Sequence, residues 1–557
     1  MKKLCFDLLK TWCDGLLSLR VRGFGDPTID GAFHCRACKV FHGRCPDAIY
    51  PLVYMYKATR DEKYLDAAKA VFDWGENMLC DDGAVFNDSQ NEWKGITVFA
   101  AVALCEALIC GKELLDAETV EKWETRLLGM GEWCFENLTE NSKSNINYPV
   151  TNVFAMALLG KYFGREDFLA RAKELENYAM SMITENGFLM GEGKPRDAVT
   201  PLGCRPIDIG YNMEESLPSL VKYAKLIGDE ELIEKLSDIL LKQLDFMLPD
   251  GAWDNSFGSR SNKWTYYGSR TSDGCAPAFV LLADRHPAFM EAARRNIELT
   301  KACTYDGLLY GGPHYRRHGE HACTHHTFEH ANALACVLEH LDKECERTDI
   351  PCDTAHGIKH YPEINTYKMA CGDYRATVTG YDFGIEFGHH ACGGSLTLLW
   401  KYGVGPMIAG GVVGYRISEP HNYQLTTATR THRCLVPRLE VQKYGVQYNS
   451  AFFATPKMSN NGSSIKVIGG LADQKSQRFD NDTDRFFTYS LSENGIEVSV
   501  ENAQETEFIL PLIAGELDVV CGEIKASEEI FFLTGGFIAT EHVISPDANG
   551  NIKLIIK

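Results

Sequence analysis

The sequence predicts an α+β multidomain protein in which an (α/α)6 toroid is followed by an antiparallel β-sandwich domain. Six clusters of polar and aromatic residues each precede a short apolar helix rich in Ala, Val and Leu. A more amphipathic helix follows each of these apolar helices, and internal repetition at tens of residues indicates stacked helical hairpins. After about residue 350 the chain changes to short β-rich runs, which indicates a second domain of a different class.

The hairpins divide into an outer and an inner ring. In TRDEKYLDAAKAVFDW, Tyr64, Leu65 and Ala68 recur at the three-and-four spacing of a one-sided helix, which is typical of an outer position. We expect outer helices near residues 4–20, 61–79, 116–137, 165–184, 229–248 and 286–302, and inner helices near 47–58, 97–110, 149–163, 215–227, 274–283 and 326–342. Because the inner helices run in the same direction, their N-terminal ends converge at one mouth.

The β-rich part is divided into runs by Gly, Asn and Asp. The runs are YRATVTGYDFGIEF, GSLTLLWKYG, HRCLVPRLEVQKYGVQY, SSIKVIGGLA, RFFTYSLSENGIEVSVEN and EIFFLTGGFIATEHVI. This pattern is typical of an antiparallel sandwich. We assign residues 1–347 to a toroidal catalytic domain and residues 360–557 to the sandwich, and we expect close packing because no low-complexity linker separates them.

Composition excludes some partners. The chain has 557 residues and a formal net charge of −20, which argues against nucleic acid because a phosphate backbone requires a basic surface. No apolar run reaches transmembrane length, so no membrane partner is expected. Asp7, Lys10 and Asp14 interrupt the apolar N-terminus, which we interpret as the first outer helix and not as an export signal. We therefore expect a cytoplasmic protein.

The chain has 20 cysteines, scattered through predicted helices, where a Cys side chain acts as a small buried hydrophobe. In a reducing cytosol disulfides are not expected. The stretch His34–Cys45 resembles a zinc knuckle, but no second pair of ligands follows at finger-like spacing. Farther on, His321 and His325, like His326 and His330, lie one helical turn apart, yet a carboxylate at the third fitting position is missing. We therefore predict neither a metal nor a cofactor.

The inner-helix starts collect side chains suited to a sugar. Helix capping explains Asp, Ser, Asn and Thr at such places, but not the accompanying Trp, Tyr, Arg and His. Aromatic rings stack on sugar faces, Arg and Asn hold carboxylates and hydroxyls, and helix N-termini favour anions. The sequence thus predicts a pocket for an acidic oligosaccharide. Its predicted substrate-binding residues are His42, Arg44, Trp93, Asn147, Tyr148, Asn212, Glu214 and Arg270.

Hydrolysis is one reaction that this pocket could support, and it requires two opposed carboxylic acids. Glu214 and Glu215 are adjacent, so on a helix they point about 100° apart and cannot flank one bond. Glu92, Asp254 or Asp273 would have to supply the second acid. A hydrolase of the glucuronidase or unsaturated-glucuronyl type therefore stays the alternative. A non-catalytic glycan-binding protein is disfavoured, because a cleft rich in acids and bases is typical of catalysis.

Elimination from a uronate requires a group that neutralises the C6 carboxylate, a base for the C5 proton and an acid for the departing O4. Tyr, His, Arg and Asn suit this work, and the mouth is richer in them than in opposed carboxylates. We expect Arg270, with His42 or Arg44, to hold the carboxylate. One of two tyrosines then takes the C5 proton and a tyrosine or histidine opposite protonates O4, which leaves a 4,5-unsaturated uronate. The catalytic candidates are Tyr211, Tyr267, His325 and His326.

The order of a toroid and then a sandwich resembles polysaccharide lyases of the heparinase and chondroitinase type. The phrases GEGKPRDAVTPLGCRPIDIGYNMEESLPSL, DGAWDNSFGSRSNKWTYYGSRTSDGC and CTHHTFEHANALA are most similar to lyases that remove rhamnose capping glucuronic acid on arabinogalactan side chains. The resemblance covers most of residues 25–345. It implies a deep central pocket, a tyrosine base and an unsaturated uronate product. The Asn-His pair of heparinase-type enzymes is absent, and Asn145-Ile146-Asn147-Tyr148 stands in its place.

Overall fold

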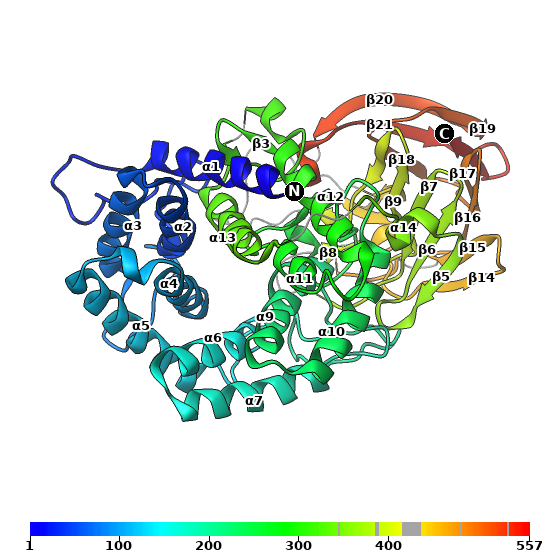
Figure 1. The fold of residues 1–557 in the computed structure, drawn as a ribbon. Helices are drawn as coiled ribbons and strands as arrows, with labels where there is room; N and C mark the ends of the chain where they lie inside the picture. The colour runs from blue at the N-terminus through cyan, green and yellow to red at the C-terminus, as the bar shows by residue number, and fades with distance from the viewer. Residues whose placement is uncertain are drawn as a thin grey trace.

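The computed structural model describes residues 1–319, 321–342, 346–384, 389–414, 436–473, 475–479, 482–531 and 534–557. Within these ranges, helices make up the N-terminal part of the chain and strands the C-terminal part (Figure 1). This arrangement confirms the predicted fold class. The portions of the predicted β-rich runs at 385–387, 432–435 and 532–533 lie outside the described residues.

The helical part is a ring of hairpins. Its outer helices are α1 (Lys2–Leu19), α3 (Glu62–Trp74), α5 (Ala117–Asn137), α7 (Glu166–Ser181), α10 (Glu230–Gln243) and α12 (Pro287–Ala302). Its inner helices are α2 (Ile49–Thr59), α4 (Thr97–Gly111), α6 (Asn147–Phe163), α9 (Leu217–Ile227), α11 (Ala276–Leu281) and α13 (Thr324–His340). Inner helices such as α4 are buried on nearly all sides, whereas outer helices such as α10 bury one face.

The fourth inner helix begins earlier than the sequence pattern predicts. A helical turn, α8 (Ile209–Tyr211), leads into a π-helical turn at Asn212–Ser216, and α9 follows without a break. The carboxylate of Asp208 caps this start by accepting the backbone N–H of Tyr211 at 3.0 Å. Single π-turns inside helices are frequent at functional sites because they change which side chains face one direction.

The ring closes where α1 packs against α13, and Figure 1 shows the first helix beside the last inner one. The indole N–H of Trp12 donates to the hydroxyl of Thr304 at 2.9 Å. Gly15 of α1 lies so close to Gly307 that an added Cβ would meet its carbonyl oxygen at 2.0 Å. A side chain at position 15 would therefore push α1 away from the last hairpin.

Where it is described, the second part of the chain contains a two-stranded sheet of β8 (His389–His390) and β11 (Val412–Gly414) and three larger antiparallel sheets. The first has the order β10 (Gly405–Ala409), β9 (Ser395–Lys401), β7 (Tyr374–Thr379), β6 (Thr366–Cys371), β5 (Gly357–Tyr361). The second is β13 (Val446–Asn449), β12 (Arg438–Lys443), β18 (Glu507–Leu512), β21 (Ile538–Ser545), β20 (Glu523–Phe531). The third is β14 (Lys457–Asn460), β15 (Ser464–Gly469), β16 (Arg485–Ser492), β17 (Gly495–Glu501), β22 (Ile552–Ile556), β19 (Leu517–Cys521). A short helix, α14 (Pro351–Thr354), precedes the first sheet.

Strand β9 of the first sheet is buried on both faces. Along β9, Leu396 and Leu399 belong to the core that the three sheets share. Leu398 and Trp400, on the other face, belong to the core of the toroid. Successive strand residues point to opposite faces, so a strand between two cores is buried at nearly every position, as β9 is. In the described ranges, no helix combines the length and hydropathy that crossing a bilayer requires.

Candidate active site

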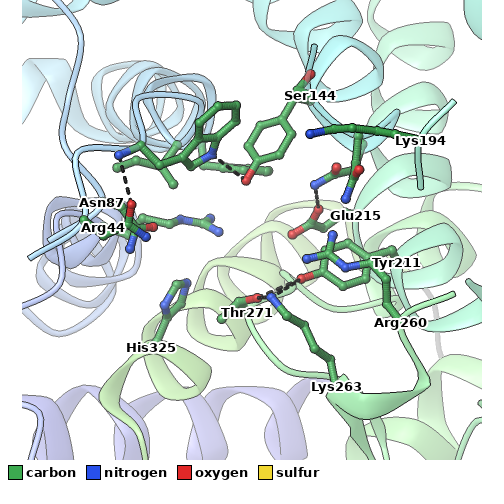
Figure 2. A pocket seen from close by; sticks show the side chains of 17 residues that line it. Arg44, Asn87, Ser144, Lys194, Tyr211, Glu215, Arg260, Lys263, Thr271 and His325 are labelled. Atoms are coloured by element: carbon green, nitrogen blue, oxygen red, sulfur yellow. Dashed lines mark hydrogen bonds between the residues drawn. The ribbon is translucent and has the colours of Figure 1, made fainter. Parts of the chain in front are cut away.

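A cavity of about 240 Å³ opens at the converging N-terminal ends of the inner helices. Its lining residues come from the segments that precede or begin the inner helices, as Figure 2 shows. They are Arg44, Asn87, Asn91, Trp93, Ile96, Phe99, Ser144, Asn145, Asn147, Tyr148, Lys194, Tyr211, Glu215, Arg260, Lys263, Thr271 and His325. Four of the seventeen are basic and one is a carboxylate, so the cavity is basic within an acidic protein.

Tyr211 has one cation beside its hydroxyl and another over its ring. The Lys263 amine lies 3.4 Å from this hydroxyl, and the Arg260 guanidinium lies 3.9 Å from the ring centroid. The hydroxyl of Thr271, a residue with a left-handed backbone at φ 64°, shares a hydrogen bond of 2.8 Å with it. Such a backbone costs energy in a β-branched residue and is typical of sites where the surrounding structure imposes it. Nearby positive charge stabilises a phenolate, which is the form that accepts a proton.

Two buried carboxylates hold this arrangement in place. Asp208 accepts the backbone N–H of Tyr211 with one oxygen and that of Arg260, at 3.2 Å, with the other. Glu192 accepts the Arg260 guanidinium at 3.1 Å and the backbone N–H of Asn147 at 3.1 Å. Burial raises the pKa of both carboxyls above the ordinary range. The two side chains therefore couple segments that are far apart in sequence at one wall of the cavity.

The π-turn sends its two glutamates to different places. Glu215 lines the cavity and accepts the side-chain amide of Asn147 at 2.6 Å. Burial, followed by the charge of Asp273, raises the pKa of Glu215 well above its ordinary value, which favours a proton-bearing carboxyl. Glu214 instead accepts the Ser269 backbone N–H at 2.7 Å and the Ser272 hydroxyl at 2.5 Å, outside the lining. The sequence predicted Glu214 as the substrate-binding member of this pair.

The positive charge of Arg44 is matched by carboxylates of the protein. Its guanidinium donates to Asp47 at 2.7 Å, to Asp273 at 2.9 Å and to Glu329 at 2.5 Å, and it lies 4.0 Å above the ring of Phe99. These charges hold the pKa of Arg44 well above its ordinary value, although burial opposes the shift. Arg44 lines the cavity, but its geometry is that of a buried ion-pair centre more than of a carboxylate clamp.

The two predicted catalytic histidines lie in different places: one lines the cavity, and the other lies outside it with the second predicted tyrosine. His325 lines the cavity, and its Nε2 lies 3.3 Å from a carboxylate oxygen of Glu329. Burial, with Arg44, lowers the pKa of His325 well below the ordinary value, which favours the neutral imidazole. His326 is hydrogen-bonded through Nδ1 to the Tyr267 hydroxyl at 3.1 Å, and both lie outside the lining. Burial raises the pKa of Tyr267 well above that of a free tyrosine, which disfavours a phenolate there.

An aromatic pair forms the rim. Trp93, with 40% of its surface exposed, donates its indole N–H to the hydroxyl of Tyr148 at 2.9 Å. The two rings meet edge to face with centroids 5.3 Å apart. Such a partly exposed pair offers an apolar surface next to polar groups, as a sugar requires.

Of the predicted site residues, the structure brings six together at the cavity. They are Arg44, Trp93, Asn147, Tyr148, Tyr211 and His325. The other six, His42, Asn212, Glu214, Tyr267, Arg270 and His326, lie outside its lining. Arg270, the expected neutraliser, donates its guanidinium to the backbone carbonyl of Asn262. Sequence reasoning did not select Lys194, or Lys263, which directly precedes the aromatic phrase WTYYGSR.

The ring nitrogen of His42 lies in a second, separate cluster. Cys35, Cys38, His42 and Cys323 are all buried, and their potential ligand atoms lie within 4.8 Å of one another. The sequence offered no second pair of ligands near the knuckle, because Cys323 joins it from the other end of the toroid. This donor set fits a tetrahedral metal site.

Known proteins resemble both parts of this chain. Residues 9–353 match the family model described as the ulvan lyase N-terminal domain, and residues 358–530 match the ulvan lyase C-terminal domain. The chain belongs to the ulvan lyase family. A broad-specificity ulvan lyase of Formosa agariphila is 37% identical to it over 97% of this chain and 87% of that protein. The chain is thus a polysaccharide lyase, a carbon–oxygen lyase that acts on uronic-acid-containing saccharides, as the sequence predicts.

Solved structures show a similar fold at low identity. The chondroitin AC lyase of Streptomyces coelicolor A3, in complex with chondroitin sulphate, aligns with 100% of this chain and 79% of its own at a TM-score of 0.55 and 12% identity. A tyrosine-to-alanine mutant of the same lyase aligns over the same shares at a TM-score of 0.53 and 11% identity. At this identity the likeness establishes the fold alone.

Proposed function

We propose that this member of the ulvan lyase family cleaves the glycosidic bond at O4 of a glucuronate residue in an ulvan-type acidic polysaccharide or its oligosaccharides. The reaction is a β-elimination that leaves a 4,5-unsaturated uronate. The cationic setting of the Tyr211 hydroxyl carries this proposal, because it provides a base and a carboxylate-binding charge at one point. The family and the basic cavity support the same chemistry.

The connectivity of a uronate explains why these groups must be neighbours. The carboxylate carbon C6 is bonded directly to C5, so the group that removes the C5 proton lies close to the group that neutralises the carboxylate. Lys263 lies 3.4 Å from the Tyr211 hydroxyl, and Arg260 covers its ring. We assign Tyr211 as the base, and Lys263 with Arg260 as the pair that holds the carboxylate. These cations lower the cost of the negative charge that develops at C5 and C6.

We assign Glu215 as the acid that protonates O4. Its raised pKa keeps a proton on the carboxyl, and the amide of Asn147 fixes one of its oxygens. Glu215 and Tyr211 both face the cavity (Figure 2), as the two ends of one elimination require. The predicted tyrosine or histidine acid is replaced in this assignment by a carboxylic acid.

Hydrolysis fits this site less well. Among the described lining residues Glu215 is the single carboxylate, whereas hydrolysis of either stereochemistry uses two. Asp254 is bound by Lys368 at 2.8 Å and Thr377 at 2.6 Å, and Asp273 is bound by Arg44. Neither lines the cavity, and Glu92 is exposed.

The leaving residue is part of the proposal. We keep rhamnose as the residue attached to O4, with its less polar face on the aromatic pair of Trp93 and Tyr148. Ulvan, and separately oligosaccharides with rhamnose-capped glucuronate, are the substrates to compare. A new ultraviolet absorbance from the conjugated double bond reports elimination. New reducing ends without that absorbance would contradict elimination and favour hydrolysis.

The base assignment is tested by two matched substitutions. Tyr211→Phe and Tyr267→Phe each remove one buried hydroxyl and leave the ring in place. We expect Tyr211→Phe to reduce kcat by about two orders of magnitude or more, the usual scale of a lost general base. Tyr267→Phe should have a much smaller effect, because Tyr267 lies outside the cavity. The reverse ranking would contradict the assignment, and thermal unfolding of both variants checks that they are folded.

A further inference from the structure

The cluster of Cys35, Cys38, His42 and Cys323 has the geometry of a closed metal site. In tetrahedral zinc sites, Zn–S bonds of about 2.3 Å and Zn–N bonds of about 2.0–2.1 Å place two sulfurs ~3.8 Å apart and a sulfur and a nitrogen ~3.6 Å apart. The sulfur of Cys323 lies 3.8 Å from that of Cys35 and 3.5 Å from that of Cys38. Nε2 of His42 lies 3.6 Å from the Cys323 sulfur.

The surroundings are also those of a metal site. The four ligand residues are 0–7% exposed, and the three cysteines form a small buried cluster with Ala37 and Val40. The backbone N–H of Cys38 points at the sulfur of Cys35 at 3.3 Å, a contact that stabilises a thiolate. Lys39 then takes a left-handed backbone, φ 60°, which returns the chain so that its N–H bonds to the Cys35 carbonyl at 2.8 Å.

We propose that Cys35, Cys38, His42 and Cys323 bind one structural Zn²⁺ that joins the first and last hairpins of the toroid. A set of three cysteines and one histidine selects a borderline-soft cation of tetrahedral preference. Four protein ligands leave no open position for substrate or water, so this zinc is structural.

The position of the site in the fold gives the ion its role. His42 lies just before α2, the first inner helix, and Cys323 lies just before α13, the last inner helix. The ion therefore connects segments separated by 281 residues, at the point where the ring closes. A cross-link that closes so long a loop removes many conformations from the unfolded chain.

The same ion would position two residues of the cavity wall. Arg44 follows His42 by two residues, and His325 follows Cys323 by two residues. The rings of His42 and His325 meet with centroids 5.2 Å apart. Zinc would thus fix this wall of the cavity without touching the substrate.

Metal analysis of the purified full-length protein is the first test. We expect about one zinc per chain after dialysis against a weak chelator, because structural sites with this ligand set bind tightly. Thiol-blocking mercurial reagents should release it, and Co²⁺ exchanged into the site should show the thiolate charge-transfer and strong visible bands of a tetrahedral site. The proposal would be overturned by metal-free protein with all thiols reduced whose melting temperature equals that of the same protein with zinc. An intact mass that shows a disulfide would also overturn it.

Substitution separates this site from other zinc on the protein. Cys323→Ser and Cys38→Ser should each lose most of the bound zinc and unfold at a lower temperature. Cys45→Ser is the matched control: Cys45 is fully buried in the same segment, but its sulfur contacts the Phe33 carbonyl at 3.7 Å and is not part of the cluster. It should keep the zinc. Zinc retained by Cys323→Ser would overturn the assignment, and the Co²⁺ spectrum of the unsubstituted protein decides the matter if a variant fails to fold.

Discussion

At the residue scale, the proposed base and the proposed acid lie in different electrostatic surroundings. Lys263 and Arg260 place positive charge beside Tyr211, whereas burial and Asp273 raise the pKa of Glu215 and so favour its neutral carboxyl. An elimination needs this pairing, with a proton acceptor and a proton donor ready at one pH. Keeping a carboxyl buried there costs stability, because the folded protein is destabilised when a buried carboxyl ionises.

Replacing Glu215 by Gln should therefore raise stability and lower activity together. The pKa of Glu215 is raised in the folded protein. The contribution of this carboxyl to the stability of the protein is therefore greatest at pH below its ordinary pKa of about 4.5, and it is lost as the pH rises through the folded-state pKa. Glu215→Gln removes this loss and retains an acceptor for Asn147. Its melting temperature should exceed that of the unsubstituted protein at pH above neutrality, and the difference should shrink on acidification. Turnover should fall by about two orders of magnitude or more.

The control is Glu92→Gln on the exposed part of the same mouth, which should change neither quantity appreciably. A Glu215→Gln protein that melts at a lower temperature at every pH would show that the carboxylate is charged and stabilising. Such a result would remove Glu215 as the acid but would leave the assignment of Tyr211 untouched.

At the element scale, the start of the fourth inner helix organises the site. One carboxylate, Asp208, caps α8 and also accepts the backbone N–H of Arg260, so a single side chain positions both Tyr211, the proposed base, and the cation that covers its ring. The π-turn that follows directs Glu215 to the cavity and Glu214 away from it. Sequence periodicity places this helix but does not reveal an inserted residue in its first turn, because the apolar pattern starts later.

A comparison of two helix caps tests this organisation. Asp208 caps an inner helix beside the cavity, and Asp229 caps the outer helix α10 by accepting the Leu232 backbone N–H at 3.0 Å. Replacing either with Ala should cost about 0.5–2 kcal/mol of stability, the usual range for a lost cap. Only Asp208→Ala should also reduce kcat strongly, and Asp208→Asn, which keeps an oxygen acceptor, should recover part of it. Equal activity losses in the two Ala variants would contradict a positioning role for Asp208.

At the scale of the whole molecule, the sequence predicts the architecture better than the site. The alternation of all-round apolar and one-sided helices predicts both rings, since burial on one or two sides leaves a direct imprint on composition. Asn147 and Tyr148 could be predicted as site residues because they stand at the start of an inner helix that the same pattern predicts. Lys263 could not be predicted, because nothing in a sequence indicates that a lysine before a hairpin lies beside a tyrosine from another helix. Cys323 was likewise beyond local spacing rules.

The two parts of the chain meet through polar groups as well as apolar ones. Asp254, fully buried in the toroid, receives the Lys368 amine at 2.8 Å and the Thr377 hydroxyl at 2.6 Å, both from the first sheet. A second pair, Lys359 with Asp245, crosses the same boundary where the lysine side chain is 61% exposed. The first sheet therefore supplies the cation that pairs with a buried carboxylate of the toroid. The stability of the helical part thus depends on the strands beside it.

These two lysines give a matched test of that dependence. Lys368→Met leaves the buried Asp254 carboxylate without its cation, and breaking a buried pair in this way costs about 3–5 kcal/mol. Lys359→Met removes an exposed pair, which is worth about 0–1 kcal/mol. We therefore expect a large fall in the melting temperature for the first variant and almost none for the second. Adding Asp254→Asn to Lys368→Met should recover much of the loss, because the uncompensated charge is then gone. Equal effects of the two lysines would mean that the ion pair at Asp254 does not couple the domains.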